Sequence, residues 1–212
     1  MLIKLKGSST NENLPEFVNI VDKEWIKTTV DGQYLDLSYY TRLNRSNSFG
    51  IEIKFKGDES TNIERKIFLT SSNYINATWG TDGNLVVGVA SNGQSPINQP
   101  KSFQCSTDEE HVVRVNVLNE TITFDDETVS ITKTGVSSSA PNLTYAGGSS
   151  GSTSKAGALS IGYIKVFDNS GTLKNHFQPK IINGVHCLKD TETGDILLDA
   201  TGGDLLAYND EE

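Results

Sequence analysis

The chain has 212 residues, a formal net charge of −9 and an apolar fraction of 35%. This length is sufficient for one substantial domain with its own core. The negative charge disfavours nucleic acid and anionic lipid as partners. No apolar run approaches the roughly 18 residues that a membrane-spanning helix needs, so we expect no membrane insertion.

The N-terminal segment has the least regular pattern. Its start, MLIKLKGSSTNEN, contains a strand-like run at 3–6 and lacks the apolar stretch of a secretory signal. The chain therefore stays where it is made, leaves by another route such as lysis of a host, or has lost a leader. The best helical candidate is 14–25, with Pro15 suited to a first turn, although an extended arm would have a similar sequence. We predict an arm or attachment segment over 1–30 and one β domain over 31–212.

Strand signals dominate the rest of the chain. Residues 49–56 (FGIEIKFK) alternate strictly between apolar and polar side chains, and 111–131 divides into three further strands. Residues 73–91 form a predicted hairpin whose turn contains Asp82-Gly83, a dipeptide suited to positive φ. Shorter strands are predicted at 34–37, 66–69, 143–146, 159–167 and 195–200. Many short strands separated by turns are typical of an antiparallel two-sheet sandwich.

The segment 162–190 has the composition of a scaffold that closes a sheet. Asp168-Asn169-Ser170-Gly171 suits a turn, and Pro179 lacks an N–H and therefore suits a strand end or edge. Asp190 precedes Thr191 and Gly194, so we expect its carboxylate to accept hydrogen bonds from backbone N–H groups across the following turn. These roles favour a closing strand over the wall of a catalytic site.

The same segment resembles the closing part of laminin-G-like, concanavalin-A-like jelly rolls found in bacteriophage virion proteins and in surface proteins of gut bacteria. Three motifs carry the resemblance: Ile164-Lys165-Val166-Phe167-Asp168-Asn169, Phe177-Gln178-Pro179, and Asn183-Gly184-Val185 followed by Leu188, Asp190 and Gly194. The family usually has Gly-Leu-Tyr-Asp where this chain has Cys187-Leu188-Lys189-Asp190, a departure that concerns packing. The resemblance extends over residues 29–208 and implies an all-β, antiparallel two-sheet jelly-roll sandwich with a short N-terminal arm.

The resemblance also implies a function. It indicates a non-enzymatic structural or adhesion protein of a phage virion, used as decoration, fibre or tail component. Its partners would be other virion proteins, further copies of itself, and host-surface glycans. The alternative is a carbohydrate-binding module of a gut bacterial surface protein, and a glycoside hydrolase is a third candidate. The expected location is the virion or, in the alternative, the bacterial cell surface.

Glycan binding makes a specific demand on the sequence. A sugar stacks its apolar face on an exposed aromatic ring and bonds its hydroxyls to carboxylates and amides. The hairpin at 73–91 and the strand at 143–146 offer both kinds of group. The predicted glycan-binding face consists of Tyr74, Asn76, Trp79, Asp82, Asn84 and Tyr145. The competing interpretation is that Trp79 packs in the core.

Catalytic chemistry has little support in the sequence. A glycosidase needs two carboxylates that face each other across the sugar, whereas Asp108-Glu109-Glu110 and Asp125-Asp126-Glu127 lie at turns where adjacent side chains diverge. The histidines His111, His176 and His186 stand in no Ser-His-Asp or metal-binding arrangement. We therefore expect no catalytic residue.

The sequence predicts no cofactor but leaves Ca²⁺ open. Turn oxygens of Asp82, Asp125 and Asp168 are of the type that Ca²⁺ prefers, yet they show no ion-specific spacing. The two cysteines, Cys105 and Cys187, have no metal-ligand spacing either. We interpret them as buried, reduced thiols, with a disulfide between them as the alternative.

Overall fold

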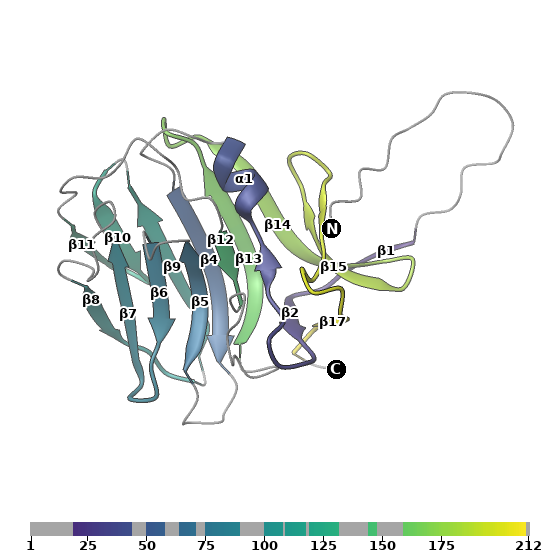
Figure 1. The fold of residues 1–212 in the computed structure, drawn as a ribbon, viewed down its shortest axis with the longest axis horizontal. Coiled ribbons are helices and arrows are strands. Elements are labelled where there is room, and N and C mark those ends of the chain that lie inside the picture. The colour runs from purple at the N-terminus through teal and green to yellow at the C-terminus, as the bar shows by residue number, and fades with distance from the viewer. Residues whose placement is uncertain are drawn as a thin grey trace, which may run out of the picture.

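The computed structural model describes residues 19–43, 50–57, 64–70, 75–89, 100–107, 109–117, 119–131, 144–147 and 159–210. They form two antiparallel β-sheets that pack face to face, with one short helix among them (Figure 1). This arrangement confirms the predicted all-β jelly-roll sandwich.

The larger sheet contains the strands β1 (Ile20–Asp22), β2 (Trp25–Thr28), β4 (Gly50–Gly57), β9 (His111–Asn116), β10 (Thr121–Phe124), β11 (Glu127–Ser130), β13 (Leu159–Phe167), β14 (Leu173–Ile182), β15 (Val185–Asp190), β16 (Ile196–Leu197) and β17 (Leu205–Tyr208). Their order is β11-β10-β9-β4-β13-β14-β15-β16, with β1, β2 and β17 joining beside β13 and β14.

The smaller sheet contains the strands β3 (Leu35–Asp36), β5 (Arg65–Thr70), β6 (Ile75–Trp79), β7 (Asn84–Val89), β8 (Lys101–Gln104) and β12 (Thr144–Ala146). Their order is β3-β12-β5-β6-β7-β8. The helix α1 (Ser38–Leu43) follows β3 directly.

The core lies between the two sheets because each strand directs alternate side chains inward. On β4, the residues Ile51, Ile53 and Phe55 are fully buried. The intervening residues Lys54 and Lys56, by contrast, lie on the outer face of the large sheet. This outer face is therefore polar, and it is where the candidate site is found.

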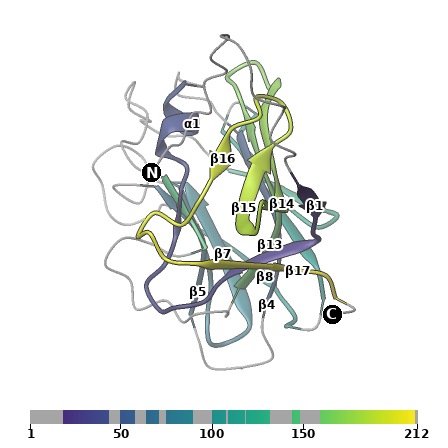
Figure 2. The same ribbon diagram turned by 90° about the vertical axis from the view of Figure 1, so that its right-hand side faces the viewer.

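The large sheet divides into a fork at β13 and β14. The two strands pair only through residues 164–167 and 173–177. Beyond that, residues 180–182 of β14 pair with β1, whereas Ser160 and Ile161 of β13 pair with β2. Figure 2 faces this part of the molecule. The chain between β1 and β2 links the two prongs, and it leaves room between them on the outer face.

The structure corrects the N-terminal predictions. The helix predicted at 14–25 is wrong in its described part, because Ile20–Asp22 and Trp25–Thr28 are strands of the large sheet. Residues 20–22 and 25–28 therefore pair with the large sheet, whereas residues 1–18, with the strand predicted at 3–6, lie outside the described residues, so the extent of the predicted arm stays a prediction. Local spacing could not reveal this, because both strands are stabilised by partners more than 130 residues away.

Helix α1, the one helix among the residues that the structure describes, was not predicted. The sequence at 34–37 predicts a strand, and the chain leaves β3 after Asp36 to form α1. The Asp36 carboxylate accepts hydrogen bonds from both the backbone N–H and the hydroxyl of Ser38. These local bonds satisfy a donor at the start of the helix. Within the helix, Tyr39 is exposed and Tyr40 is buried in the core.

Candidate functional site

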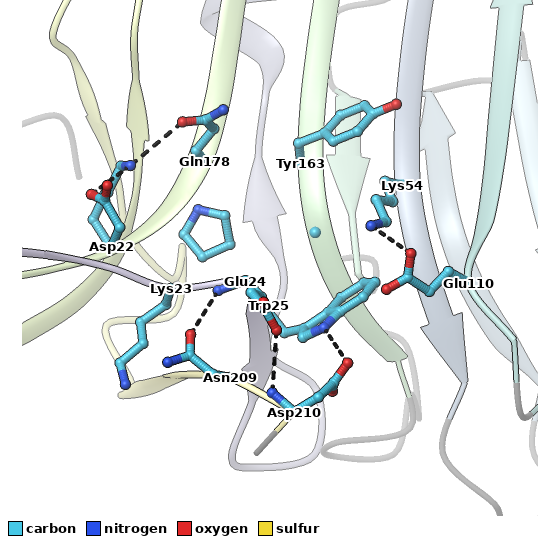
Figure 3. Close-up of a pocket in the computed structure, with 13 residues that line it drawn as sticks. Asp22, Lys23, Glu24, Trp25, Lys54, Glu110, Tyr163, Gln178, Asn209 and Asp210 are labelled. Carbon is cyan, nitrogen blue, oxygen red and sulfur yellow. Dashed lines mark hydrogen bonds and ion pairs between the residues drawn. The ribbon is translucent and has the colours of Figure 1, made fainter. Parts of the chain in front are cut away.

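An open groove of about 920 Å³ lies in the fork of the large sheet (Figure 3). We call it the fork groove. It is lined by Asp22, Lys23, Glu24, Trp25, Lys54, Glu110, Gly162, Tyr163, Gln178, Pro179, Lys180, Asn209 and Asp210. These residues come from both prongs of the fork, from β4, from the residue before β9, and from the segment after β17.

The floor of the fork groove depends on Gly162. The register of β13 against β4 shifts between Ile161 and Tyr163, so Gly162 sits at a β-bulge. A Cβ atom on Gly162 would lie 3.1 Å from Cζ3 of Trp25 and 3.1 Å from Cδ of Lys54. The absence of a side chain therefore lets Trp25 and Lys54 pack directly against the backbone of β13.

Trp25 is a buried residue that supports one wall of the groove. Its side chain is almost fully buried, and its Nε1 donates a hydrogen bond of 3.1 Å to Oδ2 of Asp210. Two ammonium groups lie over the indole ring, Lys56 at 4.3 Å and Lys54 at 4.9 Å from a ring centroid. Lys56 also pairs with Asp210, and this hydrogen bond lowers the pKa of the Asp210 carboxyl below its usual value. The wall is thus held in place by charge and by cation–π contacts.

Ion pairs border the fork groove on opposite sides. Nζ of Lys54 lies 2.6 Å from Oε2 of Glu110, and Nζ of Lys180 lies 2.8 Å from Oδ1 of Asp22. Figure 3 shows Asp22 beside Gln178 on one side and Lys54 with Glu110 on the other. Each lysine projects from the sheet, and each carboxylate comes from a neighbouring strand or loop. The groove therefore offers adjacent hydrogen-bond donors and acceptors on both walls.

Tyr163 lines the groove next to Gly162. Its hydroxyl donates a hydrogen bond of 3.0 Å to Oε1 of Glu52, and the ammonium group of Lys165 lies 4.4 Å from the ring centroid. Burial, followed by the negative charge of Glu52, raises the pKa of Tyr163 above its usual range. The phenol is therefore neutral and fixed in orientation, so it can act as a contact surface rather than as an acid or base.

The predicted glycan-binding residues lie elsewhere, at the small sheet. Trp79 is 1% exposed, and its ring contacts Phe55 at 6.1 Å between centroids while the guanidinium of Arg65 lies 4.6 Å away. The competing interpretation, core packing, is therefore the observed one, and this ring cannot stack on a surface ligand. The reason is strand parity: Trp79 shares the inward face of β6 with Ile75 and Ala77.

The polar members of that predicted face do reach the surface. Asp82 accepts a hydrogen bond from the side chain of Asn84, which lowers the pKa of the Asp82 carboxyl, and Asn84 in turn accepts one from Gln104. Asn76 accepts a hydrogen bond from the hydroxyl of Thr78. Their binding role stays a prediction.

The other two predicted aromatic residues cannot be placed at the site. Tyr74 lies outside the described residues. The backbone of Tyr145 pairs with Leu69, which pairs with Asn76, so the register brings these three residues into one row of the small sheet.

Sequence reasoning missed the fork groove because its residues come from distant parts of the chain. The one local signal was Gly162, a glycine inside a strand pattern, which indicates a bulge or a close backbone approach. The pairing of Trp25 with Asp210 spans 185 residues and leaves no trace in local spacing.

One cluster has the residue types of an acid–base triad. His111 is buried; its Nδ1 lies 2.8 Å from Oδ2 of Asp125, and its Nε2 lies 3.4 Å from Oγ of Ser106. Nε2 lies closer, at 3.0 Å, to the carbonyl oxygen of Ser106, and the Ser106 hydroxyl donates to Glu109. A ring nitrogen that faces a carbonyl oxygen carries a hydrogen and donates a hydrogen bond to that oxygen, so it has no lone pair to accept the proton of the hydroxyl. The cluster therefore fastens the loop before β9 to the turn after β10.

Both cysteines are buried free thiols, as the sequence analysis interpreted them. Among the residues that the structure describes, no group of three or more His, Cys, Asp or Glu side chains could hold a metal ion. The same residues contain no helix long and apolar enough to cross a membrane.

No protein-family model matches the sequence, and neither does any curated protein. Solved structures do show similarity. A sialidase from Trypanosoma rangeli in complex with sialic acid has a TM-score of 0.52 at 12% identity; the match covers 74% of this chain but only 28% of the sialidase. This likeness shows the β-sandwich fold.

Two further structures are more distant in TM-score. The CBM40 module of the Ruminococcus gnavus IT-sialidase, bound to α2,3-sialyllactose, has a TM-score of 0.49 at 15% identity and covers 69% of this chain and 90% of the module. A structure from work on botulinum neurotoxin type C, whose cell entry depends on two ganglioside molecules, has a TM-score of 0.41 at 12% identity. That match covers 76% of this chain and 41% of the toxin chain.

Proposed function

We propose that this chain is a non-enzymatic carbohydrate-binding module that holds a glycan in the fork groove. The observation that carries the proposal is the groove itself, which brings the aromatic residues Trp25 and Tyr163, amide side chains and ion-paired side chains together around a bare glycine floor. Sugars bind to this combination because their rings have apolar faces and their edges have hydroxyl groups. The sandwich fold agrees with the proposal but does not specify it, since one fold serves many functions.

The residues of the groove favour binding over catalysis. Its four carboxylates are engaged by neighbours: Glu110 by Lys54, Asp22 by Lys180, Asp210 by Lys56 and Trp25, and Glu24 by the backbone N–H of Asp210. A glycosidase keeps one of its two carboxyl groups protonated as an acid. Carboxylates that are already held by neighbouring donors are suited to hydrogen bonding with a ligand.

The proposed location of the protein follows from the resemblance of its sequence to jelly-roll domains of phage and bacterial surface proteins. We propose an adhesion role on a phage virion, with a bacterial cell surface as the alternative, and the fork groove would serve either. Detection of the chain in purified phage particles by mass spectrometry would support the virion. Its detection in outer-surface fractions of uninfected bacteria would support the alternative.

A groove-filling variant tests the proposed function. Gln178 is half-buried and lines the fork groove from β14, and Lys189 is its cross-strand neighbour on β15, outside the groove lining. We expect the control variant Lys189→Trp to bind the same glycans on an array as the wild-type protein. The test variant Gln178→Trp should lose at least tenfold in affinity for those glycans, because its indole ring occupies the groove. Equal melting temperatures of the two variants would show that folding is intact. Unchanged binding by Gln178→Trp would contradict the proposal.

A further inference from the structure

We infer that the fork groove selects neutral glycans with vicinal hydroxyl groups and rejects acidic ones. This inference rests on the proposed function and adds the class of ligand to it.

The charge balance of the groove disfavours an acidic ligand. Its lining contains three lysines and four carboxylates, so its formal charge is negative. The ammonium group of Lys54 already has the Glu110 carboxylate 2.6 Å away. A ligand carboxylate or sulfate that approached Lys54 would therefore come close to Glu110 as well, and like charges repel. The net charge of −9 on the whole chain acts in the same direction.

The presence of lysine rather than arginine in the groove also disfavours an acidic ligand. Carboxylate, phosphate and sulfate groups are best bound by the planar fork of an arginine, which donates two parallel hydrogen bonds. None of the described residues that line the groove is an arginine. Arg114, on the same outer face, lies over the ring of Phe167 and beside Glu52 instead. The groove thus lacks the side chain that binds acidic groups best.

The ion pairs match a vicinal diol. An ammonium group has three N–H donors and a carboxylate has about four acceptor positions, so each partner keeps bonding capacity after the pair has formed. In the Lys54–Glu110 pair both side chains are partly exposed, at 29% and 50%. One sugar hydroxyl can accept from Lys54 while its neighbour donates to Glu110. The Lys180–Asp22 pair offers the same combination on the opposite wall.

A glycan array with three ligand sets tests the inference: neutral glycans, acidic glycans, and neutral glycans whose vicinal diols have been cleaved by periodate. We expect binding to the first set only, and less than a twofold change in affinity between 50 and 500 mM NaCl, because no net ionic contact forms. Binding confined to acidic glycans, or a tenfold loss of affinity in high salt, would overturn the inference and leave the proposed function standing. Binding to none of the sets would overturn both.

A charge-neutralising variant tests the mechanism of rejection. Glu110→Gln keeps the size and hydrogen-bonding ability of the side chain but removes its negative charge, and we expect it to gain at least tenfold in affinity for acidic glycans. The matched control is Glu64→Gln, because Glu64 forms a similarly exposed ion pair with Lys66 on the small sheet, away from the groove. Continued rejection of acidic glycans by Glu110→Gln would contradict the charge argument.

Discussion

At the scale of single residues, Asp190 shows how one side chain closes the C-terminal part of the fold. Its carboxylate is fully buried. Oδ1 accepts hydrogen bonds from the backbone N–H groups of His176 and Glu192, and Oδ2 accepts from the side chains of Asn175 and Thr193. The sequence predicted bonds across the turn after Asp190, and the bond from Glu192 confirms them. The bonds to β14 could not be predicted, because they require the strand pairing.

We expect Asp190→Asn to lower the free energy of unfolding by about 3 kcal/mol, because an amide NH₂ would face hydrogen-bond donors in a buried site. Chemical denaturation of the purified variant measures this loss. The exposed Asp126, in the turn between β10 and β11, provides the control, since Asp126→Asn should change stability by less than about 0.5 kcal/mol. Equal effects of the two substitutions would contradict the role of Asp190.

The two thiols give a second prediction at this scale. Burial is the main cause that raises the pKa of Cys105 to about 12 and that of Cys187 to about 11. Both side chains are then protonated and inaccessible at pH 8, so we expect no reaction of the native protein with a thiol reagent within an hour. Two thiols per chain should react after denaturation.

The raised pKa values of the two thiols also predict how the stability of the protein depends on pH. The unfolded chain loses its thiol protons near pH 9, whereas the folded chain keeps them, so stability should fall as pH rises from 9 toward 11. Cys105→Ala should reduce this loss relative to the wild-type protein, as measured by denaturation at each pH.

At the scale of elements, turns and regular strands were predictable, but the fork was not. The strand predicted at 159–167 agrees with β13 residue for residue, because its alternation is local. The predicted Asp82-Gly83 turn is confirmed. Gly83 has a φ of 79°, a backbone conformation that favours glycine. The fork groove depends instead on which strands pair with each prong, and pairing partners 133 to 185 residues apart are not encoded in any short window.

The end of β4 provides a prediction about an element. A Cβ atom on Gly57 would lie 2.6 Å from two carbons of the Trp79 ring, which is itself enclosed by Phe55 and His111. We expect Gly57→Ala to reduce stability by about 2 kcal/mol, because the buried ring must shift. Gly50 stands at the other end of the same strand with contacts of 3.4 Å, so Gly50→Ala should be nearly neutral by thermal unfolding. A larger loss of stability in Gly50→Ala than in Gly57→Ala would refute this account of the packing.

At the scale of the whole molecule, the described ends of the chain meet and complete the large sheet. β17 pairs with β2 through Leu205↔Thr28 to Tyr208↔Trp25, and the side chains of Leu205 and Ala207 are buried. Beyond β17, the side chain of Asn209 accepts a hydrogen bond from the backbone of Glu24. The fork groove is therefore built partly from both ends of the sequence.

Removal of everything after Asp204 should lower the free energy of unfolding by at least about 3 kcal/mol, because two buried side chains are lost and Ile26 is uncovered. It should also abolish glycan binding, since Asp210 no longer holds Trp25. Leu206→Ala, an exposed position on the same strand, should cost less than about 1 kcal/mol. Full stability of the truncated protein would contradict the role of β17.

The antiparallel pairing of β2 with β17 also determines how the molecule responds to tension. Trp25, where β2 begins, is paired with Tyr208, where β17 ends, so a pull applied at both residues acts on the same end of the ladder. The hydrogen bonds between the two strands would then break one after another, because the force acts on one pair at a time and does not load all of them together in shear. The same ladder would resist a higher force if the pull acted at Trp25 and Leu205, because these residues lie at opposite ends of the ladder and all of its hydrogen bonds would then be loaded together.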